Sequence, residues 1–162
     1  WSPQIEIGAA VLLPENYVSD LSVRLGLYRR LAMMENSAEV DSFAAELIDR
    51  FGPLPEEVDH LIRVVQIKQL CRLSSIDQID AGPKGAAFRF RNNHFSAPDQ
   101  LINLIQSSKG QLRLRPDHKL IVVAEWPTVD VRFSGVRNVL EQLAGFLAEV
   151  RGGKRMALQL KI

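Results

Sequence analysis

The spacing of apolar residues in the first half of the chain predicts three helices. They are expected at about Ser19–Met34, between a cap at Ser37 and a stop at Gly52, and from Pro55 to about Leu73. Ser19 or Asp20 can cap the first helix and Ser37 the second, which Gly52 and Pro53 stop. The first is expected to bury a stripe of Leu21, Leu25, Tyr28, Leu31 and Ala32. The second is expected to bury a face of Val40, Phe43, Ala44, Leu47, Ile48 and Phe51.

The period of the apolar pattern changes to two after Ser74, which indicates strands. Strands are predicted at Ser75–Asp80, Ala86–Arg91, Gln111–Arg115 and Leu120–Glu125. The segment Gln4–Leu13 is either a further strand or an extended connector that pairs with one. Helices are predicted at Pro98–Ser107 and Ser134–Val150, and Gly152 with Gly153 is expected to break the second of these. The final stretch 156–162 alternates like a strand but has no obvious partner.

This order of elements predicts an α+β fold. A helical N-terminal half is expected to pack on a small, mostly antiparallel sheet with one inserted helix and a C-terminal helix. Residues 1–150 are assigned to one domain and residues 151–162 to a tail of uncertain structure. Since the chain begins with Trp1 and not with Met, we expect it to be a piece of a longer protein.

Composition narrows the class of protein. The chain has 162 residues and a net charge of +1, with ordinary apolar and charged fractions, so a packed domain is expected. The single cysteine, Cys71, excludes a disulfide scaffold and a cysteine-rich zinc site and agrees with a cytoplasmic location. The sequence contains no phosphate-binding loop, no nucleophile elbow and no paired-histidine metal motif. We therefore expect no catalytic residue, metal or cofactor in this domain.

Charge along the chain is strongly divided despite the small net value. From Glu35 to Asp59 there are eight acidic residues and one basic residue, and His60 to Arg91 holds six basic and two acidic residues. Within the acidic block, Glu46, Asp49 and Arg50 stand at helical spacing opposite the apolar face. Such a ridge is either a solvated helix face or a docking surface for a charged partner.

Two other functions remain open at this stage. Arg89, Arg91, Arg113 and Arg115 could line a basic sheet face that binds nucleic acid, or the solvent face of an ordinary half-buried sheet could simply be basic. Phe88 and Phe90 alternate with the first two arginines and are expected to face the core. A small enzyme would require polar groups that converge in a pocket, which the spacing of residues does not reveal.

An ordered set of short runs resembles a known family. LPENYVSD at 13–20, VRL at 23–25, LYRRLA at 27–32 and ELIDRFGPLP at 46–55 are followed by Val58. Together they resemble the C-terminal domain of the bacterial transcription-repair coupling factors (Mfd). The resemblance covers about residues 1 to 150, is most specific from Leu13 to Leu73, and is absent from the last dozen residues.

The resemblance implies a non-catalytic, regulatory domain of an ATP-dependent DNA translocase that couples stalled transcription to nucleotide excision repair. In the family this domain docks on a UvrB-like module of the same polypeptide and masks the surface that recruits UvrA, and engagement of RNA polymerase on DNA releases it. The family contact matches Glu46, Asp49 and Arg50 here. The first two would meet basic residues of the module, and Arg50 would meet a carboxylate there or hold Glu46.

Overall fold

The chain forms two compact units, and their boundary falls inside a helix. The computed structural model describes the backbone of residues 1–160 and the side chains of residues 1–153. Residues 9–69 make up the first unit, here called the helical unit. Residues 1–8 and the chain from Leu70 onward make up the second, here called the sheet unit.

The helical unit consists of α1 (Leu21–Met33), α2 (Ser37–Phe51) and most of α3 (Glu56–Ser74). Asp20 caps α1, where its carboxylate accepts a hydrogen bond from the Val23 N–H at 3.0 Å. The cap of α2 is Asn36 and not the predicted Ser37, because the Asn36 side chain accepts the Glu39 N–H. The positive φ of Gly52, 94°, ends α2 as predicted.

One apolar cluster holds the helical unit together. Its buried members are Leu13, Val18, Leu27, Leu31, Val40, Phe43, Leu47, Val58 and Ile62. The predicted stripe of α1 is partly wrong, since Leu21 and Leu25 are exposed and Leu27 is buried in their place. Ile48 is likewise exposed. Leucines occur on more than one face of α1, so periodicity alone could not choose the face that packs.

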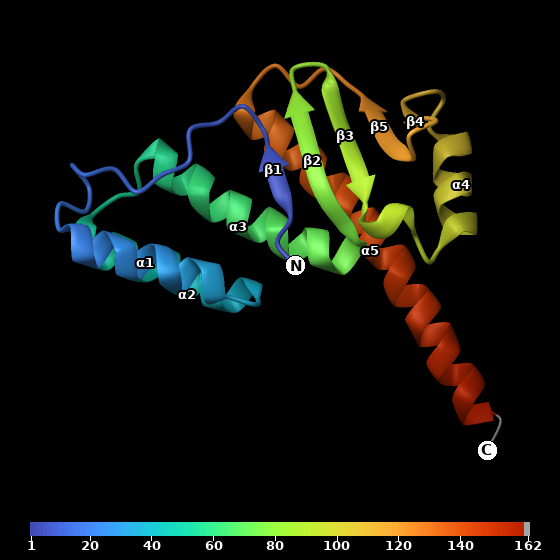
Figure 1. The fold of residues 1–162 in the computed structure, drawn as a ribbon, viewed down its shortest axis with the longest axis horizontal. Coiled ribbons are helices and arrows are strands. Elements are labelled where there is room, and N and C mark those ends of the chain that lie inside the picture. Colours follow the sequence, from blue (N-terminus) through green and yellow to red (C-terminus); the bar gives the residue numbers. More distant parts are fainter. Residues whose placement is uncertain (161–162) are drawn as a thin grey trace. The chain divides into compact units, whose positions relative to one another are not determined.

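The sheet unit contains a five-stranded mixed sheet of the order β1-β2-β3-β5-β4 (Figure 1). Its strands are β1 (Gln4–Glu6), β2 (Ile76–Gly82), β3 (Gly85–Phe90), β4 (Leu112–Leu114) and β5 (Lys119–Val123). The pair β1–β2 is parallel and the other three pairs are antiparallel. The predicted α+β class and mostly antiparallel sheet are therefore confirmed.

Two helices complete the sheet unit. The inserted helix α4 (Pro98–Ser107) has the predicted bounds, and α5 (Val129–Leu160) contacts β2 and lies behind the sheet in Figure 1. The core is built from fully buried side chains of the sheet and of α5: Ile76, Ile79, Phe88, Leu120, Val136, Leu140 and Leu143. Register places Ile79, Phe88 and Leu120 side by side on the covered face. The two phenylalanines of β3 are buried, as predicted.

Several predicted boundaries are wrong for identifiable reasons. The helix α5 begins at Val129, five residues early, because the Thr128 hydroxyl accepts the Val131 N–H as a cap. It also continues through Gly152 and Gly153 to Leu160, since a helical glycine costs only about 1 kcal/mol relative to alanine. The segment 4–13 forms a strand only in β1, because Gly8 with φ 71° turns the chain. In the unassigned stretch 156–162, residues 156–160 are helical and 161–162 lie outside the described residues.

Candidate functional site

The packing of α2 decides which of its side chains reach solvent. Val40, Phe43 and Leu47 face the core of the helical unit, so the positions between them point outward. Glu46 is half-buried at the edge of the packed face, while Asp49 and Arg50 are exposed. The three charged residues therefore lie together on one side of α2, as their spacing predicted. We keep the name α2 ridge for Glu46, Asp49 and Arg50.

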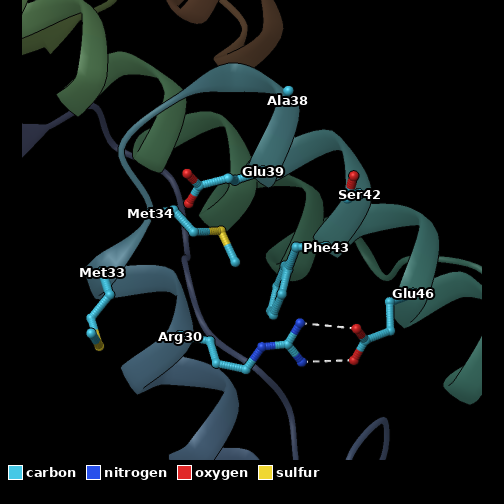
Figure 2. A pocket seen from close by; sticks show the side chains of 8 residues that line it. All are labelled: Arg30, Met33, Met34, Ala38, Glu39, Ser42, Phe43 and Glu46. Carbon is cyan, nitrogen blue, oxygen red and sulfur yellow. Dashed lines mark hydrogen bonds and ion pairs between the residues drawn. The ribbon is translucent and has the colours of Figure 1, made fainter.

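Both oxygens of the Glu46 carboxylate are engaged inside the helical unit. Arg30, on α1, donates from Nη1 to Oε2 at 2.7 Å and from Nη2 to Oε1 at 2.9 Å (Figure 2). Arg50 donates from Nη1 to the same Oε2 at 2.9 Å, four residues along α2. One carboxylate thus binds two guanidinium groups through three of its roughly four acceptor sites, which leaves little capacity for a cation from a partner. This contact modifies the expectation that Glu46 itself meets basic residues of a partner.

Aromatic rings lie next to both arginines. The Arg30 guanidinium carbon is 5.2 Å from the centre of the buried Phe43 ring, and that of Arg50 is 4.9 Å from the centre of the Phe51 ring. A cation over a ring face is attracted to the ring quadrupole. Each guanidinium is therefore held between a carboxylate and a ring, which fixes its position more firmly than either contact alone.

The two arginines hold the pKa of the Glu46 carboxyl at about 2, well below its ordinary 4.5. The main cause is the hydrogen bond from Arg30, followed by that from Arg50. A carboxyl whose pKa is lower in the folded state stabilises the fold above its unfolded-state pKa, and this contribution disappears as pH falls through the folded-state pKa.

Exchange of Glu46 for glutamine is expected to lower the free energy of unfolding by about 1 kcal/mol at pH 7, as for a well-aligned surface ion pair. The difference from the unchanged protein should decrease as pH falls from about 4.5 to about 2. Urea denaturation at several pH values measures it. Asp41→Asn is the matched control on the same helix and should show no comparable loss. An equal stability of Glu46→Gln and the unchanged protein at pH 7 would contradict this role.

Asp49 differs from Glu46 in being open to a partner. It is exposed, and it makes no hydrogen bond or ion pair with any residue that the structure describes. Arg50 uses one of its five N–H donors on Glu46. The α2 ridge therefore offers one unoccupied carboxylate and one guanidinium with spare donors.

A shallow groove of about 590 Å³ borders the Arg30–Glu46 pair (Figure 2). Its lining residues are Arg30, Met33, Met34, Ala38, Glu39, Ser42, Phe43 and Glu46. Of its two carboxylates, Glu46 binds both arginines and Glu39 accepts from the Asn36 amide at 2.8 Å. A second hollow of about 380 Å³, in the sheet unit, has no titratable side chain in its lining.

The alternative nucleic-acid residues are only partly brought together. Register and alternation place Arg89, Arg113 and Arg115 on the open face of the sheet. Arg91 lies in the short 3₁₀ turn Arg91–Asn93 and stacks on the Trp1 ring at 4.4 Å. The predicted four-arginine face therefore contains three of the four.

The described part of the chain contains neither a candidate metal site nor a candidate membrane span. No group of three or more His, Cys, Asp or Glu side chains in that part of the chain could hold a metal ion. No helix there is long and apolar enough to cross a membrane.

Comparison with known proteins assigns the family. The model of the TRCF domain family matches residues 7–101, which is more than half of the chain and includes α1 to α3 and the α2 ridge. The chain belongs to the TRCF domain family. The resemblance seen in the sequence is thereby confirmed, and β4, β5 and α5 of this TRCF domain lie outside the matched range.

Two relatives of this TRCF domain share a name. It is 38% identical over 121 residues to a transcription-repair-coupling factor of Rickettsia conorii, covering 75% of this chain and 11% of that protein. It is 33% identical over 140 residues to the one of Haemophilus influenzae, covering 86% and 12%. The chain thus spans about a tenth of the length of the relatives that it matches.

A solved structure shows the same fold. A crystal structure described as the C-terminal domain of transcription-repair coupling factor superposes with a TM-score of 0.73. The match covers 94% of this chain and 96% of that one at 19% identity, so it compares the fold alone.

Sequence reasoning missed Arg30 as part of the site. It lies 16 residues before Glu46, on a different helix, and no spacing rule links the two. The available signal was the short connection 34–36 between α1 and α2, which requires neighbouring helices to lie close together.

Proposed function

We propose that this TRCF domain is the regulatory, non-catalytic domain of a cytoplasmic transcription-repair coupling factor, an ATP-dependent DNA translocase acting in nucleotide excision repair. It would dock on the UvrB-like module of the same polypeptide and mask the surface that recruits UvrA. The observation that best supports this is the α2 ridge, where Asp49 and Arg50 are exposed beside an internally balanced Glu46.

The contacts suggest different tasks for the three ridge residues. Asp49 accepts a hydrogen bond or ion pair from a basic residue of the module, because its own carboxylate has no described partner. Arg50 donates to a carboxylate of the module with the donors that Glu46 leaves free. Glu46 acts as a positioning residue that holds Arg50 and Arg30 in place.

Docking of this kind regulates by population shift. The domain binds the closed arrangement of the parent protein and not the open one, so its affinity sets the fraction of molecules that expose the UvrA-recruiting surface. Complementary charges at a desolvated contact contribute more than the same charges in water, and they exclude partners of the wrong sign.

Replacement of Asp49 by alanine is expected to weaken binding to the separated UvrB-like module by at least tenfold, equal to about 1.4 kcal/mol. Titration calorimetry between this chain and that module measures the effect. Weaker binding is expected because a basic residue of the module loses its counter-charge inside the contact. Binding of the unchanged domain should also weaken as salt rises from 50 to 500 mM.

Asp41→Ala is the matched control, because Asp41 is another exposed aspartate of α2 and its loss changes the net charge equally. It should bind as the unchanged domain does. In the full-length protein, Asp49→Ala should increase UvrA recruitment in the absence of stalled RNA polymerase. Equal affinities of the Asp49 and Asp41 variants, or unchanged UvrA recruitment, would refute the proposed docking role.

A further inference from the structure

The two units differ in charge. The helical unit has ten acidic and six basic residues, whereas the sheet unit has nine acidic and fourteen basic residues. The net charges are therefore −4 and +5, which add to the +1 of the chain. The excess of positive charge is independent of the α2 ridge, which belongs to the helical unit.

Strand pairing places part of this excess positive charge in a row on one face of the sheet. Arg89 on β3 is paired with Lys119 on β5, and the Arg115 N–H donates to the Lys119 carbonyl at 2.9 Å. Residues paired across strands point to the same face, so the three side chains form one row. Arg113, paired with Ile121, lies in the next row on that face. We call Arg89, Arg113, Arg115 and Lys119 the basic sheet face.

Two carboxylates, Asp77 and Asp117, balance part of the charge of these four cations. Arg89 donates to Asp77 at 2.7 Å, and Arg115 donates to Asp117 at 2.7 Å. Arg113 bonds only the Gly110 carbonyl among the described residues, at 3.3 Å, and the charge of Lys119 acts on Asp117 together with that of Arg115. On the other side of the same face, β1 and β2 present Glu6 and Asp80. A polyanion would therefore contact the β3, β5 and β4 side only.

The residues of the basic sheet face indicate which class of ligand it would bind. Neighbouring strands are about 4.8 Å apart, so the cations follow one another at short, regular intervals. Between them lie Ala87 and the half-buried Ile121, and the exposed Val123 lies at the end of β5 on the same face. Phe88 and Phe90 are buried, so these rings cannot stack on bases.

We propose that the basic sheet face binds the phosphate backbone of duplex nucleic acid without sequence preference. Regularly spaced cations without aromatic rings fit the phosphates of a duplex better than the unstacked bases of a single strand. With about two phosphate contacts, the charge that the carboxylates leave unbalanced, the logarithm of the binding constant should fall with the logarithm of salt concentration at a slope of about −2. Affinity should be in the range of non-specific binding, with a Kd of about 10⁻⁴ M at physiological salt.

Fluorescence anisotropy of a labelled 20-base-pair DNA duplex, titrated with this chain from 25 to 150 mM NaCl, tests the proposal. The triple variant Arg113→Ala, Arg115→Ala, Lys119→Ala should bind at least tenfold more weakly at 50 mM NaCl. Its salt slope should fall close to zero, because the cations that contact phosphate are removed. Binding of a single-stranded oligonucleotide of equal length should be weaker than that of the duplex.

The matched control is Arg29→Ala, Arg63→Ala, Arg137→Ala, which removes the same charge from helices α1, α3 and α5. It should retain the affinity and the slope of the unchanged chain. Equal losses in both triple variants would show a non-specific effect of net charge and overturn the proposal. A tighter complex with poly-glutamate than with DNA would reassign the face to an acidic protein. The double variant Arg113→Lys, Arg115→Lys should still bind, and its failure to do so while folded would also refute backbone contact by charge.

DNA binding by the basic sheet face can be tested separately from docking through the α2 ridge. None of these substitutions touches Glu46, Asp49 or Arg50, and circular dichroism of each variant reports whether it is folded. Loss of DNA binding with normal docking to the UvrB-like module, or the reverse, would decide the two proposals independently.

Discussion

Replacement of Phe43 by alanine is expected to lower the free energy of unfolding of the helical unit by about 3–5 kcal/mol. Phe43 is 1% exposed and belongs to the central apolar cluster of this unit. Alanine removes the whole ring and leaves a cavity that the surrounding helices can fill only in part. Urea denaturation, with hydrogen exchange to locate the affected amides, measures the loss. Protection is expected to fall in α1 and α2.

Phe43 also supports the site, since Arg30 lies over its ring at 5.2 Å and binds Glu46 from there. Under conditions where Phe43→Ala remains folded, Arg30 loses one of its two supports, and docking through the α2 ridge should weaken as well. Ile48→Ala is the control, because the Ile48 side chain is exposed on the same helix. It should cost less than about 1 kcal/mol. A Phe43→Ala variant as stable as Ile48→Ala would show that the cluster is packed differently.

Replacement of Gly85 by alanine is expected to cost about 4 kcal/mol in the sheet unit. Gly85 begins β3 with φ 122°, a conformation that L-residues rarely adopt. A Cβ atom there would also lie 1.8 Å from the carbonyl oxygen of Val122. Relief of that overlap requires β3 and β5 to separate where Gly85 is paired with Val123. Thermal unfolding and hydrogen exchange of the strand amides measure the effect.

Gly82 provides the control at the other end of the same turn. It is paired with Gly85, its φ is not in the left-handed region, and a Cβ atom there would have no neighbour within 4 Å. Gly82→Ala should therefore change stability by less than about 1 kcal/mol. Similar losses in the two variants would mean that the turn as a whole, and not the close approach at Gly85, limits stability.

Local patterns predicted the secondary structure well where a short-range cause fixes it. The bounds of α4 follow from Pro98 in its first turn, and the end of α2 follows from Gly52. The β2–β3 hairpin and the burial of Phe88 and Phe90 follow from the turn at 82–85 and from strand alternation. The length of α5 did not follow, because two consecutive glycines weaken a helix without ending it.

For the candidate site, local patterns predicted the arrangement of the charged residues but not which of them are paired. Spacings of three and four residues place Glu46, Asp49 and Arg50 on one side of α2, and that arrangement needs no tertiary information. The pairing of Glu46 did need tertiary information, because Arg30 comes from another helix and its contact with Glu46 exists only when α1 and α2 pack.

The amino-acid sequence by itself determined the helices and strands, the α+β class and the TRCF family, because each depends on residue types at short, regular separations. Only the tertiary structure decided that Glu46 is bound by two arginines while Asp49 stays open, and that Arg89, Lys119 and Arg115 share one row. Both outcomes depend on which helix face packs and on which strands are neighbours. Burial of apolar surface over the whole unit sets those choices, and no local pattern encodes them.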